Sequence, residues 1–512
     1  MASFLNSAFT KFDCQKLAIF SYAFPAPYIL VTPFLNALQD NGHQLTIISS
    51  VTAMPTIEGV EHIRVQALED QVNEIVANDY VFPMSKWEEA IWISSFFYNS
   101  SNAVLSDPKV QSLLTNAEIH FDMIIVEASY TDALFGFAQH FNALLVGISA
   151  FGSTWNIDYL VGHSAPSTYE PISPVGYSKG LTLLDKWYNW IYITEEWLLE
   201  RFVYLPKQTQ LFRKYFNSSL DSLHDIRRRF SLILINYHFS LGRARSNVPN
   251  LVEVAGMHMS VPNASCDEAL QIFMDGATEG VVYFSMGLEI TSKHFPKDGQ
   301  QKLLTVFSKL KQRVIWKCEQ DELPNKSDNI YTSPLLPQRE VLAHPNVKLF
   351  ITHGGLLSII EAAYYGVPMI GLPLYYDQFS NVERMKQAGG AKSLDLYNIN
   401  VAQLMETITE LIYNPRYSRQ AKDLSRRFRD QPMSPLETAI WWTEYVLRHD
   451  GAHHMRMAEQ DLSFMQYYSV DLISTVFTRV GIVASIVAYL GLKLFNLVLA
   501  PSHIGLNVHI LN

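Results

Sequence analysis

Short runs of apolar, mostly β-branched residues recur along the first half of the chain. The runs are KLAIFSY (16–22), QLTIISS (44–50), FDMIIVEAS (121–129) and ALLVGISA (143–150). Runs of this length are typical of strands that are buried on both faces, and the stretches between them show the spacing of helices. The alternation of strands and helices predicts a parallel α/β domain.

The second half repeats the pattern after a break. Strands are expected near 281–285, 313–317, 347–352 and 368–372. The preceding stretch, NVPNLVEVAGMHMSVPNAS (247–265), is rich in Pro, Asn and Ser, as connecting segments are. With 512 residues the chain is long enough for two domains, which we place at 1–255 and 256–460.

The C-terminal part contains a long apolar segment, 472–500, interrupted by Arg479 and Lys493. Its uncharged centre, 480–492, is shorter than the roughly 20 residues that cross a bilayer. A span from about Thr475 to Val498 works if the two cations reach the membrane interfaces. The segment is therefore a candidate transmembrane helix. The start, MASFLNSAFTKFDCQ, shows no apolar signal region, so the start is atypical or targeting relies on the C-terminal segment.

Composition narrows the choice of partners. A net charge of −10 argues against nucleic acid. The low charged fraction of 17% and the high aromatic fraction of 12% suit apolar pockets or membrane contact. The three cysteines are far apart, so neither a zinc site nor a disulfide scaffold is indicated.

The stretch FITHGGLLSIIEAAYYGVPMIGLPLYYDQ (350–378) carries the clearest chemistry. Its His353, Gly354 and Gly355 stand where a strand becomes a helix, and unpaired N–H groups at a helix start bind phosphate. Two turns further, Glu361 can accept bonds from paired hydroxyls such as those of a ribose. A bare His-Gly-Gly equally suits a tight turn without a ligand. Polar residues at the end of the next strand favour binding, because open α/β sheets bind ligands at strand carboxyl ends.

This stretch resembles the sugar-nucleotide signature of the UDP-glycosyltransferases, and most closely that of the insect members. VVYFSMG (281–287), LLPQREVLAHPNVKLFITHGG (335–355), DQFSNVERM (377–385) and AEQDLSFMQYYSVDLI (458–473) fit in the expected order. The resemblance covers nearly the whole chain and is most specific in the second half. It implies two facing Rossmann-like domains (GT-B type) with a cleft between them.

The resemblance also implies an activity. A hexosyl group, with glucose as the expected sugar, would pass from a UDP-sugar to small lipophilic hydroxyl acceptors with inversion, as in detoxification. It implies a single-pass protein of the endoplasmic reticulum membrane with lumenal domains. It implies no cofactor besides the UDP-sugar, which is a substrate. Both homo- and hetero-oligomers are compatible with it. Asn-x-Ser sequons, which a lumenal protein allows, begin at Asn99, Asn217, Asn263 and Asn325.

The resemblance assigns roles to the donor-site residues. It implies that Ser285 and Gly287 form a second phosphate loop. Gln338 would contact the nucleoside and Glu361 the ribose. Asp377 and Gln378 would contact the sugar hydroxyls. Ser358, on the first helical turn, would cap the helix or bond a phosphate. The chain has no D-x-D motif, so we expect no metal and a diphosphate that is neutralised by the helix start, with His353 and Ser285 assisting.

The catalytic base is where the sequence departs from the family. The usual histidine falls on Pro27, counting back from Gly42-His43, and proline has no ionisable group. We expect His43 to cap the far end of the helix, and Tyr28 is a poor base at neutral pH. Two other family positions also differ, since Leu335 replaces a tryptophan and Leu288 a serine.

Two carboxylates are left as candidates for the base. Glu127 occupies the position of the acidic residue that orients the family's histidine, and Asp132 lies one turn later. Burial would raise the pKa of Glu127 and make it a better base.

Three functional hypotheses remain. The first is an active, membrane-anchored transferase. The second is a catalytically weak or inactive relative that binds a nucleotide sugar or a lipophilic ligand as a partner protein. The third, a soluble transferase of the bacterial type on the same fold, fits the C-terminal segment badly.

The segment 181–216 is strongly aromatic and helical, with Trp187, Trp190 and Trp197 on one face. We favour packing in the core for these rings. The alternatives are the wall of an apolar acceptor pocket and a surface that touches membrane.

Overall fold

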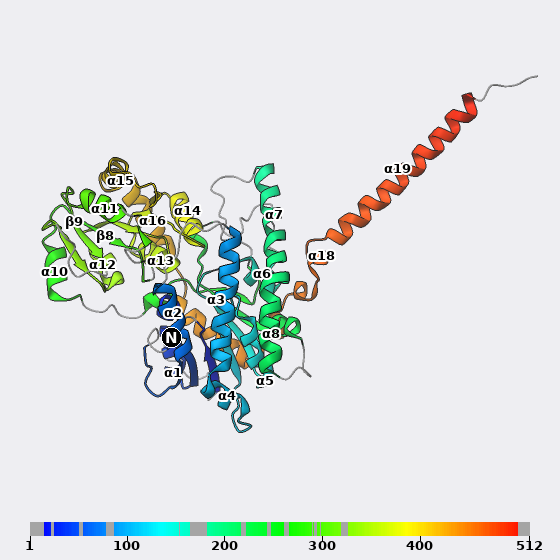
Figure 1. The fold of residues 1–512 in the computed structure, drawn as a ribbon, viewed down its shortest axis with the longest axis horizontal. Helices are drawn as coiled ribbons and strands as arrows, with labels where there is room; N and C mark the ends of the chain where they lie inside the picture. Colours follow the sequence, from blue (N-terminus) through cyan, green and yellow to red (C-terminus); the bar gives the residue numbers. More distant parts are fainter. Residues whose placement is uncertain are drawn as a thin grey trace, which may run out of the picture. The chain divides into compact units, whose positions relative to one another are not determined.

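The computed structural model describes residues 15–21, 25–50, 55–77, 86–152, 154–163, 182–216, 222–242, 247–260, 266–288, 290, 294–296, 298–318 and 326–499. The chain forms two compact units, Met1–Met457 and Ala458–Asn512 (Figure 1). Both α/β halves lie in the first unit.

The first half is built on a seven-stranded parallel sheet in the order β3-β2-β1-β4-β5-β6-β7. The strands are β1 Gln15–Ile19, β2 Gln44–Ser50, β3 Glu61–Val65, β4 Met123–Glu127, β5 Leu144–Ser149, β6 Phe230–Ile235 and β7 Leu251–Glu253. The four strands expected from the sequence are confirmed. Strands β3, β6 and β7 were not expected, and β7 lies inside the Pro- and Asn-rich segment that was taken as a connection.

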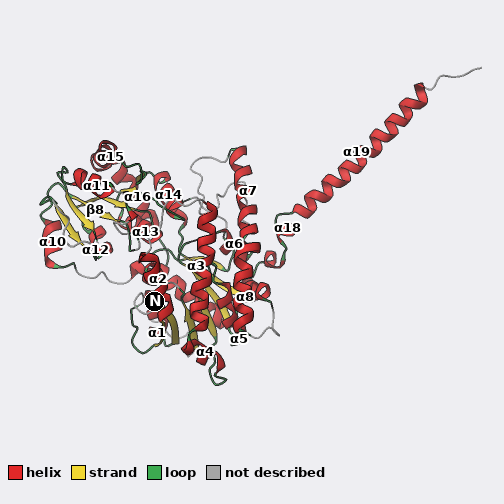
Figure 2. Ribbon diagram, in the orientation of Figure 1, coloured by secondary structure: helices red, strands yellow, loops and turns green. Residues whose placement is uncertain are grey.

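The second half is a six-stranded parallel sheet in the order β10-β9-β8-β11-β12-β13. Figure 2 shows β8 and other strands of this half in yellow among red helices. The strands are β8 Val281–Ser285, β9 Arg313–Lys317, β10 Ile330–Ser333, β11 Val347–Thr352, β12 Met369–Gly371 and β13 Ala391–Ser393. The four expected strands are again confirmed. The short strands β10 and β13 extend the sheet at its two edges.

Helices connect the strands and cover both sheets. The longer ones are α1 Ala26–Asp40, α2 Gln66–Ala77, α3 Lys86–Ser106, α4 Pro108–Thr115, α6 Trp155–Val161, α7 Leu183–Leu199, α8 Leu205–Tyr215, α10 Glu268–Asp275, α11 Gly299–Phe307, α12 Gln338–Ala343, α13 Leu356–Tyr365, α14 Gln378–Gln387, α15 Val401–Tyr413, α16 Pro415–Arg429 and α17 Pro435–Arg448. A π-helical turn, Glu200–Tyr204, joins α7 to α8. Short helical turns include α5 Gly136–His140, α9 Leu223–Ile226, η1 Asp132–Phe135, η3 Arg227–Arg229, η4 Phe239–Leu241 and η5 Met257–Ser260.

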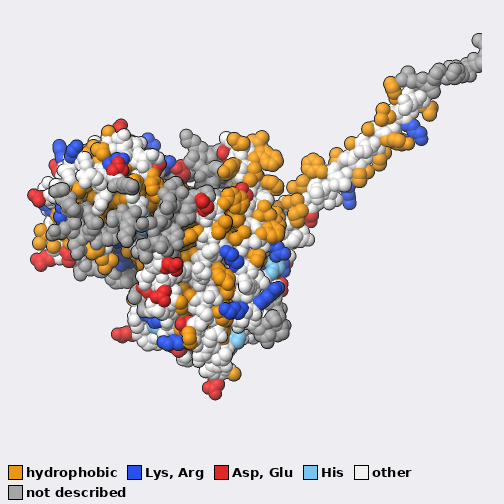
Figure 3. All heavy atoms as spheres, in the orientation of Figure 1, with side chains coloured by type: hydrophobic (Ala, Val, Ile, Leu, Met, Phe, Trp, Pro, Cys, Tyr) orange, Lys and Arg blue, Asp and Glu red, His pale blue; other side chains and the backbone are white. Residues whose placement is uncertain are grey.

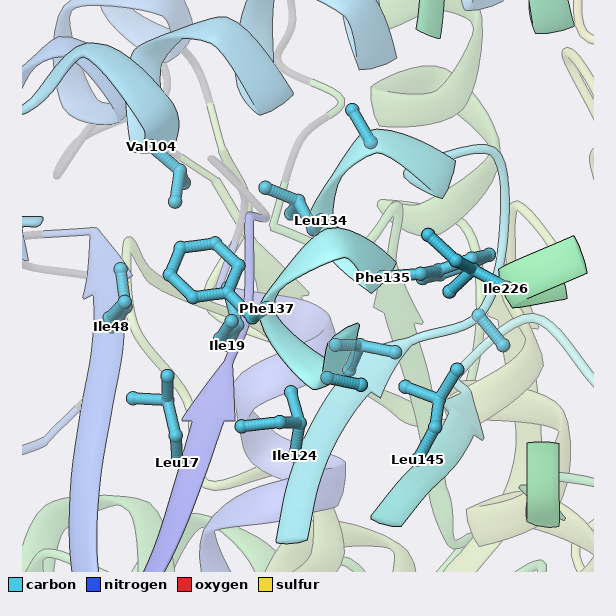
Figure 4. Packing of buried hydrophobic residues seen from close by; sticks show 14 of the residues in the cluster. Leu17, Ile19, Ile48, Val104, Ile124, Leu134, Phe135, Phe137, Leu145 and Ile226 are labelled. Atoms are coloured by element: carbon cyan, nitrogen blue, oxygen red, sulfur yellow. The ribbon is translucent and has the colours of Figure 1, made fainter. Parts of the chain in front are cut away.

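Strand β1 shows how the apolar runs are used. Leu17 and Ile19 belong to the core on one face of the first sheet, and Ala18 and Phe20 to the core on the other face. Figure 4 shows the first of these cores, where Leu17, Ile19 and Ile124 point toward Phe137. Because successive side chains alternate between faces, a strand covered on both sides has to be apolar throughout.

Helix α17 returns to the first half of the chain. Its Ala439 and Val446 belong to the same core as the inner face of α1, and α17 packs against α1 and β6. At the end of α1, Asn41 Nδ2 donates to Glu444 Oε1 at 2.9 Å, and His43 Nε2 lies 3.5 Å from the same oxygen. His43 therefore pairs with α17. Asn41 occupies the C-cap position of α1, and the backbone N–H of His43 donates to Leu38 O at 3.1 Å, so His43 closes the helix end with its main chain and not with its ring.

Helix α7 corrects the expectation for the tryptophans. Trp187 is 59% exposed and Trp190 is 44% exposed, so core packing is wrong for these two rings. The helix instead buries the face that carries Asn189, Tyr192, Ile193 and Leu199. Apolar side chains gather over α7 in the space-filling view (Figure 3).

The second unit is dominated by one helix. Helix α19, Val470–Leu499, follows the short helices η8 Ala458–Asp461 and α18 Phe464–Tyr467. Its segment Val470–Val498 has a mean hydropathy of 1.8 and is long and apolar enough to cross a membrane.

Candidate functional site

Two glycine-containing turns of the second sheet meet at one edge. Strand β8 ends at Ser285 and the neighbouring β11 ends at Thr352, and these two residues are partners in the parallel ladder. Gly287 has φ +83°, and a Cβ on it would lie 2.6 Å from His353 Cε1. The structure therefore brings together the two phosphate loops that the resemblance implied.

The imidazole of His353 lies between two glycines. A Cβ on Gly355 would come within 2.5 Å of His353 Nε2, so any larger residue at Gly287 or Gly355 would displace the ring. Thr352 Oγ1 lies 3.3 Å from His353 Nδ1. Burial, with a smaller contribution from the charge of Lys317, lowers the pKa of His353 to about 4. The ring is neutral at physiological pH and can donate one N–H to an anion.

The start of α13 suits an anion. Gly355 forms the N-cap and supplies no capping side chain to the first turn. Gly354 has φ +91°, and a Cβ on it would lie 2.4 Å from Val382 Cγ2, so this bend requires glycine. Ser358 does not cap the helix, and its Oγ accepts a bond from Gln338 Nε2 at 3.0 Å. The first-turn N–H groups and the helix dipole thus provide the positive end of the site.

Glu361 is the centre of a buried polar network. Gln338 Nε2 donates to Glu361 Oε2 at 2.7 Å, and His258 Nε2 lies 3.4 Å from Glu361 Oε1. The hydroxyl of Tyr283 donates to Gln338 Oε1 at 3.3 Å. These contacts join the residues expected to bind the nucleoside and the ribose. The network fixes the carboxylate of Glu361 before any ligand is present.

His258 is a site residue that the sequence reasoning missed. It is 1% exposed and comes from η5, within the segment that was taken as a connection. Arg339 Nη1 donates to its carbonyl oxygen at 2.6 Å, which ties η5 to α12. A histidine between two methionines in a polar segment shows no periodic signal, so only the tertiary contact reveals it.

Asp377 and Gln378 follow β12 and begin α14. Gln378 Oε1 accepts bonds from the backbone N–H groups of Leu374 at 2.9 Å and Tyr375 at 3.3 Å, so its NH₂ group is the part that can meet a sugar hydroxyl. Asn381 Nδ2 donates to Asp377 Oδ2 at 2.7 Å. Burial raises the pKa of Asp377 to about 6, against the lowering effect of Asn381.

The two carboxylates proposed as bases are in different environments. Glu127 ends β4, is 1% exposed, and its Oε1 accepts the N–H of Ser129 at 3.2 Å. Asp132 Oδ1 lies 2.7 Å from Arg227 Nε, and the same guanidinium also pairs with Glu200. Burial alone would lower the pKa of Arg227, but the two carboxylates raise it above its ordinary value, so the cation is retained. Asp132 is thus part of a buried ion-pair network.

Pro27 lies in the first turn of α1 and is buried. Strands β1 and β4 are neighbours, so α1, which follows β1, begins at the sheet edge where Glu127 lies. The Tyr28 hydroxyl donates to Phe20 O at 2.9 Å and accepts the N–H of Ser50 at 3.2 Å. Burial raises the pKa of Tyr28 above its ordinary value, so this phenol is a structural group and no base.

The fold and the site define a class. Two parallel α/β halves, with two glycine turns and an uncapped helix start at one sheet edge, are the arrangement of the GT-B glycosyltransferases. Residues 31–501 match the family model that is described as "UDP-glucoronosyl and UDP-glucosyl transferase". The chain is a member of this family of UDP-glycosyltransferases.

Individual relatives agree with this assignment. The chain is 32% identical over 511 residues to UDP-glycosyltransferase UGT5 of Dactylopius coccus, covering 96% of this chain and 94% of that protein. It is 28% identical over 494 residues to UDP-glucosyltransferase 2 of the same insect, covering 94% and 93%. Human UDP-glucuronosyltransferase 2B10 is 26% identical over 503 residues, with 94% of each chain covered.

Solved structures support the fold. The glycosyltransferase of kitacinnamycin superposes with a TM-score of 0.58 at 17% identity, covering 85% of this chain and 99% of that chain. Glycosyltransferase VinC, solved in complex with DTDP, has a TM-score of 0.57 at 14% identity and covers 85% and 100%. At this identity the likeness concerns the fold alone.

Proposed function

We propose that this glycosyltransferase moves a glucosyl group from UDP-glucose to small lipophilic hydroxyl compounds, without a metal ion and with inversion at the anomeric carbon. The observation that carries the proposal is the meeting of Ser285, Gly287 and His353 with the uncapped start of α13, next to the Gln338–Glu361 network. The name of the insect relative UDP-glucosyltransferase 2 favours glucose.

Each part of the donor then has a partner. The diphosphate lies at the N–H groups of the first turn of α13, where His353 adds one donor and the helix dipole disperses the charge of the leaving group. Glu361, held by Gln338 and His258, accepts bonds from the ribose hydroxyls. Asp377 accepts bonds from sugar hydroxyls, and the NH₂ group of Gln378 donates to them.

The acceptor is activated from the other half. Attack by the acceptor oxygen on the anomeric carbon breaks the bond to the UDP oxygen, and the acceptor proton passes to a base. Glu127 is our candidate, because it is buried at the end of β4 and its carboxylate is held by the N–H of Ser129. The ion pair with Arg227 makes Asp132 a poor alternative.

A second candidate function rests on Pro27. Without an ionisable group at this position, the protein would bind the nucleotide sugar or a lipophilic ligand and turn it over slowly, as a partner of an active enzyme. The variant Pro27→His separates the two functions. If the base is lacking, this variant raises turnover of alcohols more than that of nitrophenols, whose hydroxyl ionises unaided.

The proposal includes a location. Helix α19 would anchor the protein in the endoplasmic reticulum membrane with the two halves in the lumen, where detoxification of lipophilic compounds is a fitting role. Asn99, which heads a sequon, is exposed on α3. The other sequons, at Asn217, Asn263 and Asn325, lie outside the described residues. Attachment of a glycan at Asn99 would show a lumenal location.

The donor site is tested by calorimetry on the purified full-length protein with UDP and with 2′-deoxy-UDP. We expect Glu361→Ala and His258→Ala to weaken UDP by about tenfold and 2′-deoxy-UDP much less, since the lost contact is to the ribose. His353→Ala should weaken both nucleotides alike by about tenfold, as expected for one bond to a charged group. A wild-type protein that binds neither nucleotide contradicts the proposed function.

A further inference from the structure

One hydrogen bond joins the two α/β halves next to the expected sugar contacts. The backbone N–H of Tyr376 donates to Glu89 Oε1 at 2.9 Å. Tyr376 directly precedes Asp377 in the second half, whereas Glu89 lies in the first turn of α3, which belongs to the first half. Hydrogen bonds to an ionised carboxylate are about twice as strong as neutral ones.

The backbone of Tyr376 needs support from its surroundings. Its φ is +51°, a left-handed conformation that a bulky residue adopts only when its surroundings compensate for the cost. The ring of Tyr376 packs edge-to-face on Phe151, with centroids 5.8 Å apart. Phe151 follows β5, so the first half holds Tyr376 both at its N–H and at its ring.

On the other side, the same loop is fixed to the second half. Gln378 Oε1 accepts the N–H of Leu374, and Asn381 Nδ2 donates to both Asp377 Oδ2 and the carbonyl oxygen of Gly354. The loop that carries the sugar contacts is therefore held from both halves. The bond to Glu89 comes from a charged side chain of the first half.

Electrostatics agree with this proximity. The charge of Glu89 contributes to the raised pKa of Asp377, while Arg384 on the helix of Asp377 opposes it. Glu89 itself has a raised pKa because it is partly buried, against the lowering effect of the bond from Tyr376. The bond from Tyr376 places the carboxylate of Glu89 close to the sugar contacts.

We propose that Glu89 is a positioning residue for donor-sugar recognition: its bond to Tyr376 sets the position of Asp377 and Gln378 on the glucosyl group. The inference rests on the proposed function, because it takes these two residues as the sugar contacts. It goes beyond that function because a residue of the first half would determine how the second half binds the sugar. It predicts that the affinity for the sugar depends on α3, whereas the affinity for the nucleotide does not.

The experiment compares the binding of UDP and UDP-glucose to full-length wild type and variants. We expect Glu89→Ala to weaken UDP-glucose by about tenfold and to leave UDP within about twofold, because the nucleotide contacts lie elsewhere. Glu89→Gln keeps an acceptor oxygen and should stay within about threefold of wild type for both ligands. Glu88→Gln, an exposed neighbour on the same helix, is the matched control.

The outcomes separate the inference from the proposed function. Equal weakening of UDP and UDP-glucose by Glu89→Ala, or no weakening of either, overturns the inference while the proposed function stands. A wild type that binds no UDP overturns the proposed function itself. If Glu89→Ala does not fold, Glu89→Asp takes its place, since it keeps the charge and withdraws the carboxylate by one methylene. An unchanged affinity of Glu89→Asp for UDP-glucose then overturns the inference.

Discussion

Two carboxylates near the end of β4 differ in what they can do. The Glu127 carboxylate accepts a bond from the backbone N–H of Ser129, whereas Asp132 faces a guanidinium. We expect Glu127→Gln to lower kcat for alcohols by two to four powers of ten, about the usual contribution of a general base, and to lower it less for nitrophenols. Steady-state kinetics with matched alcohol and phenol acceptors measure the difference.

Asp132→Asn serves as the contrast. It removes a charge from Arg227 in a buried ion-pair network, and breaking such a pair costs on the order of 3–5 kcal/mol. Denaturant unfolding should show this loss, while the ratio of alcohol to phenol turnover in the remaining folded protein stays at the wild-type value. Brisk turnover of an alcohol that is unaffected by Glu127→Gln would show that the base lies elsewhere.

The raised pKa of the buried Asp377 predicts that stability and sugar binding depend on pH in opposite directions. Its pKa of about 6 is higher than in the unfolded chain, so the folded state binds the proton more tightly. This contribution to stability is fully present below about pH 4 and is lost as the pH rises through 6. In the proposed function the carboxylate of Asp377 contacts the sugar, so we expect sugar binding to follow the opposite course and to weaken below pH 6.

The variant Asp377→Asn tests the pH dependence of both stability and sugar binding. Because it cannot ionise, it should unfold at a higher temperature than wild type at pH 8 and at nearly the same temperature at pH 4. Its affinity for UDP-glucose should fall by about tenfold at pH 8, with UDP nearly unchanged. A variant that is no more stable at pH 8 than wild type would contradict a pKa of Asp377 that is raised by burial.

At the residue scale, some residues of the candidate site could be predicted from the sequence and others could not. His353 and Gly355 could be named because their local order indicates a strand-to-helix turn, and Gly287 could be named from the family resemblance. The structure brings the three residues together. His258 and Glu89 could not. Each acts through one tertiary contact to a residue far along the chain, and neither stands in a periodic or motif-like setting.

At the element scale, α7 presents tryptophans to its surroundings. Leu183, Leu184, Trp187, Trp190 and Phe202 are all more than 40% exposed along α7 and the π-helical turn. Helix α19 is long and apolar enough to cross a membrane, and Trp rings prefer the interface of a bilayer. Of the two alternatives to core packing, we therefore favour membrane contact for this apolar face.

The test uses the first unit, ending at Met457, with phospholipid vesicles. We expect Trp187→Ser combined with Trp190→Ser to lower vesicle binding by about tenfold, through the loss of buried apolar area. Trp441→Ser, at another exposed tryptophan on α17, is the control and should bind like the wild-type unit. Equal binding of all three proteins would exclude α7 as a contact.

Strands and helices were predictable to different degrees. Strands β2, β8, β9 and β11 have the expected bounds, because continuous apolar runs are unambiguous when both faces are covered. The edge strands β3, β10 and β13 are partly exposed, so their sequences contain polar residues and lack this signal; β10 and β13 are also short. The exposure of Trp187 was missed because helical periodicity identifies a face without telling whether it is covered.

At the scale of the whole molecule, α19 should hold the chain in membranes. Over Val470–Val498 the helix is apolar, and none of it is buried within the protein. We expect the full-length protein to stay in the pellet after alkaline carbonate extraction, and a chain ending at Met457 to be released. Release of both would contradict a spanning helix, and retention of both would place the anchor elsewhere.

The return of α17 to α1 has a consequence for synthesis. Asn41 and Glu444 bond across 403 positions, so at about 5–20 residues per second the ribosome needs roughly 20 to 80 s to supply the partner of α1. During that time the nascent first half has an apolar face with nothing to cover it. Chaperones that hold such faces should therefore bind the nascent chain until α17 emerges, shortly before α19 is synthesised.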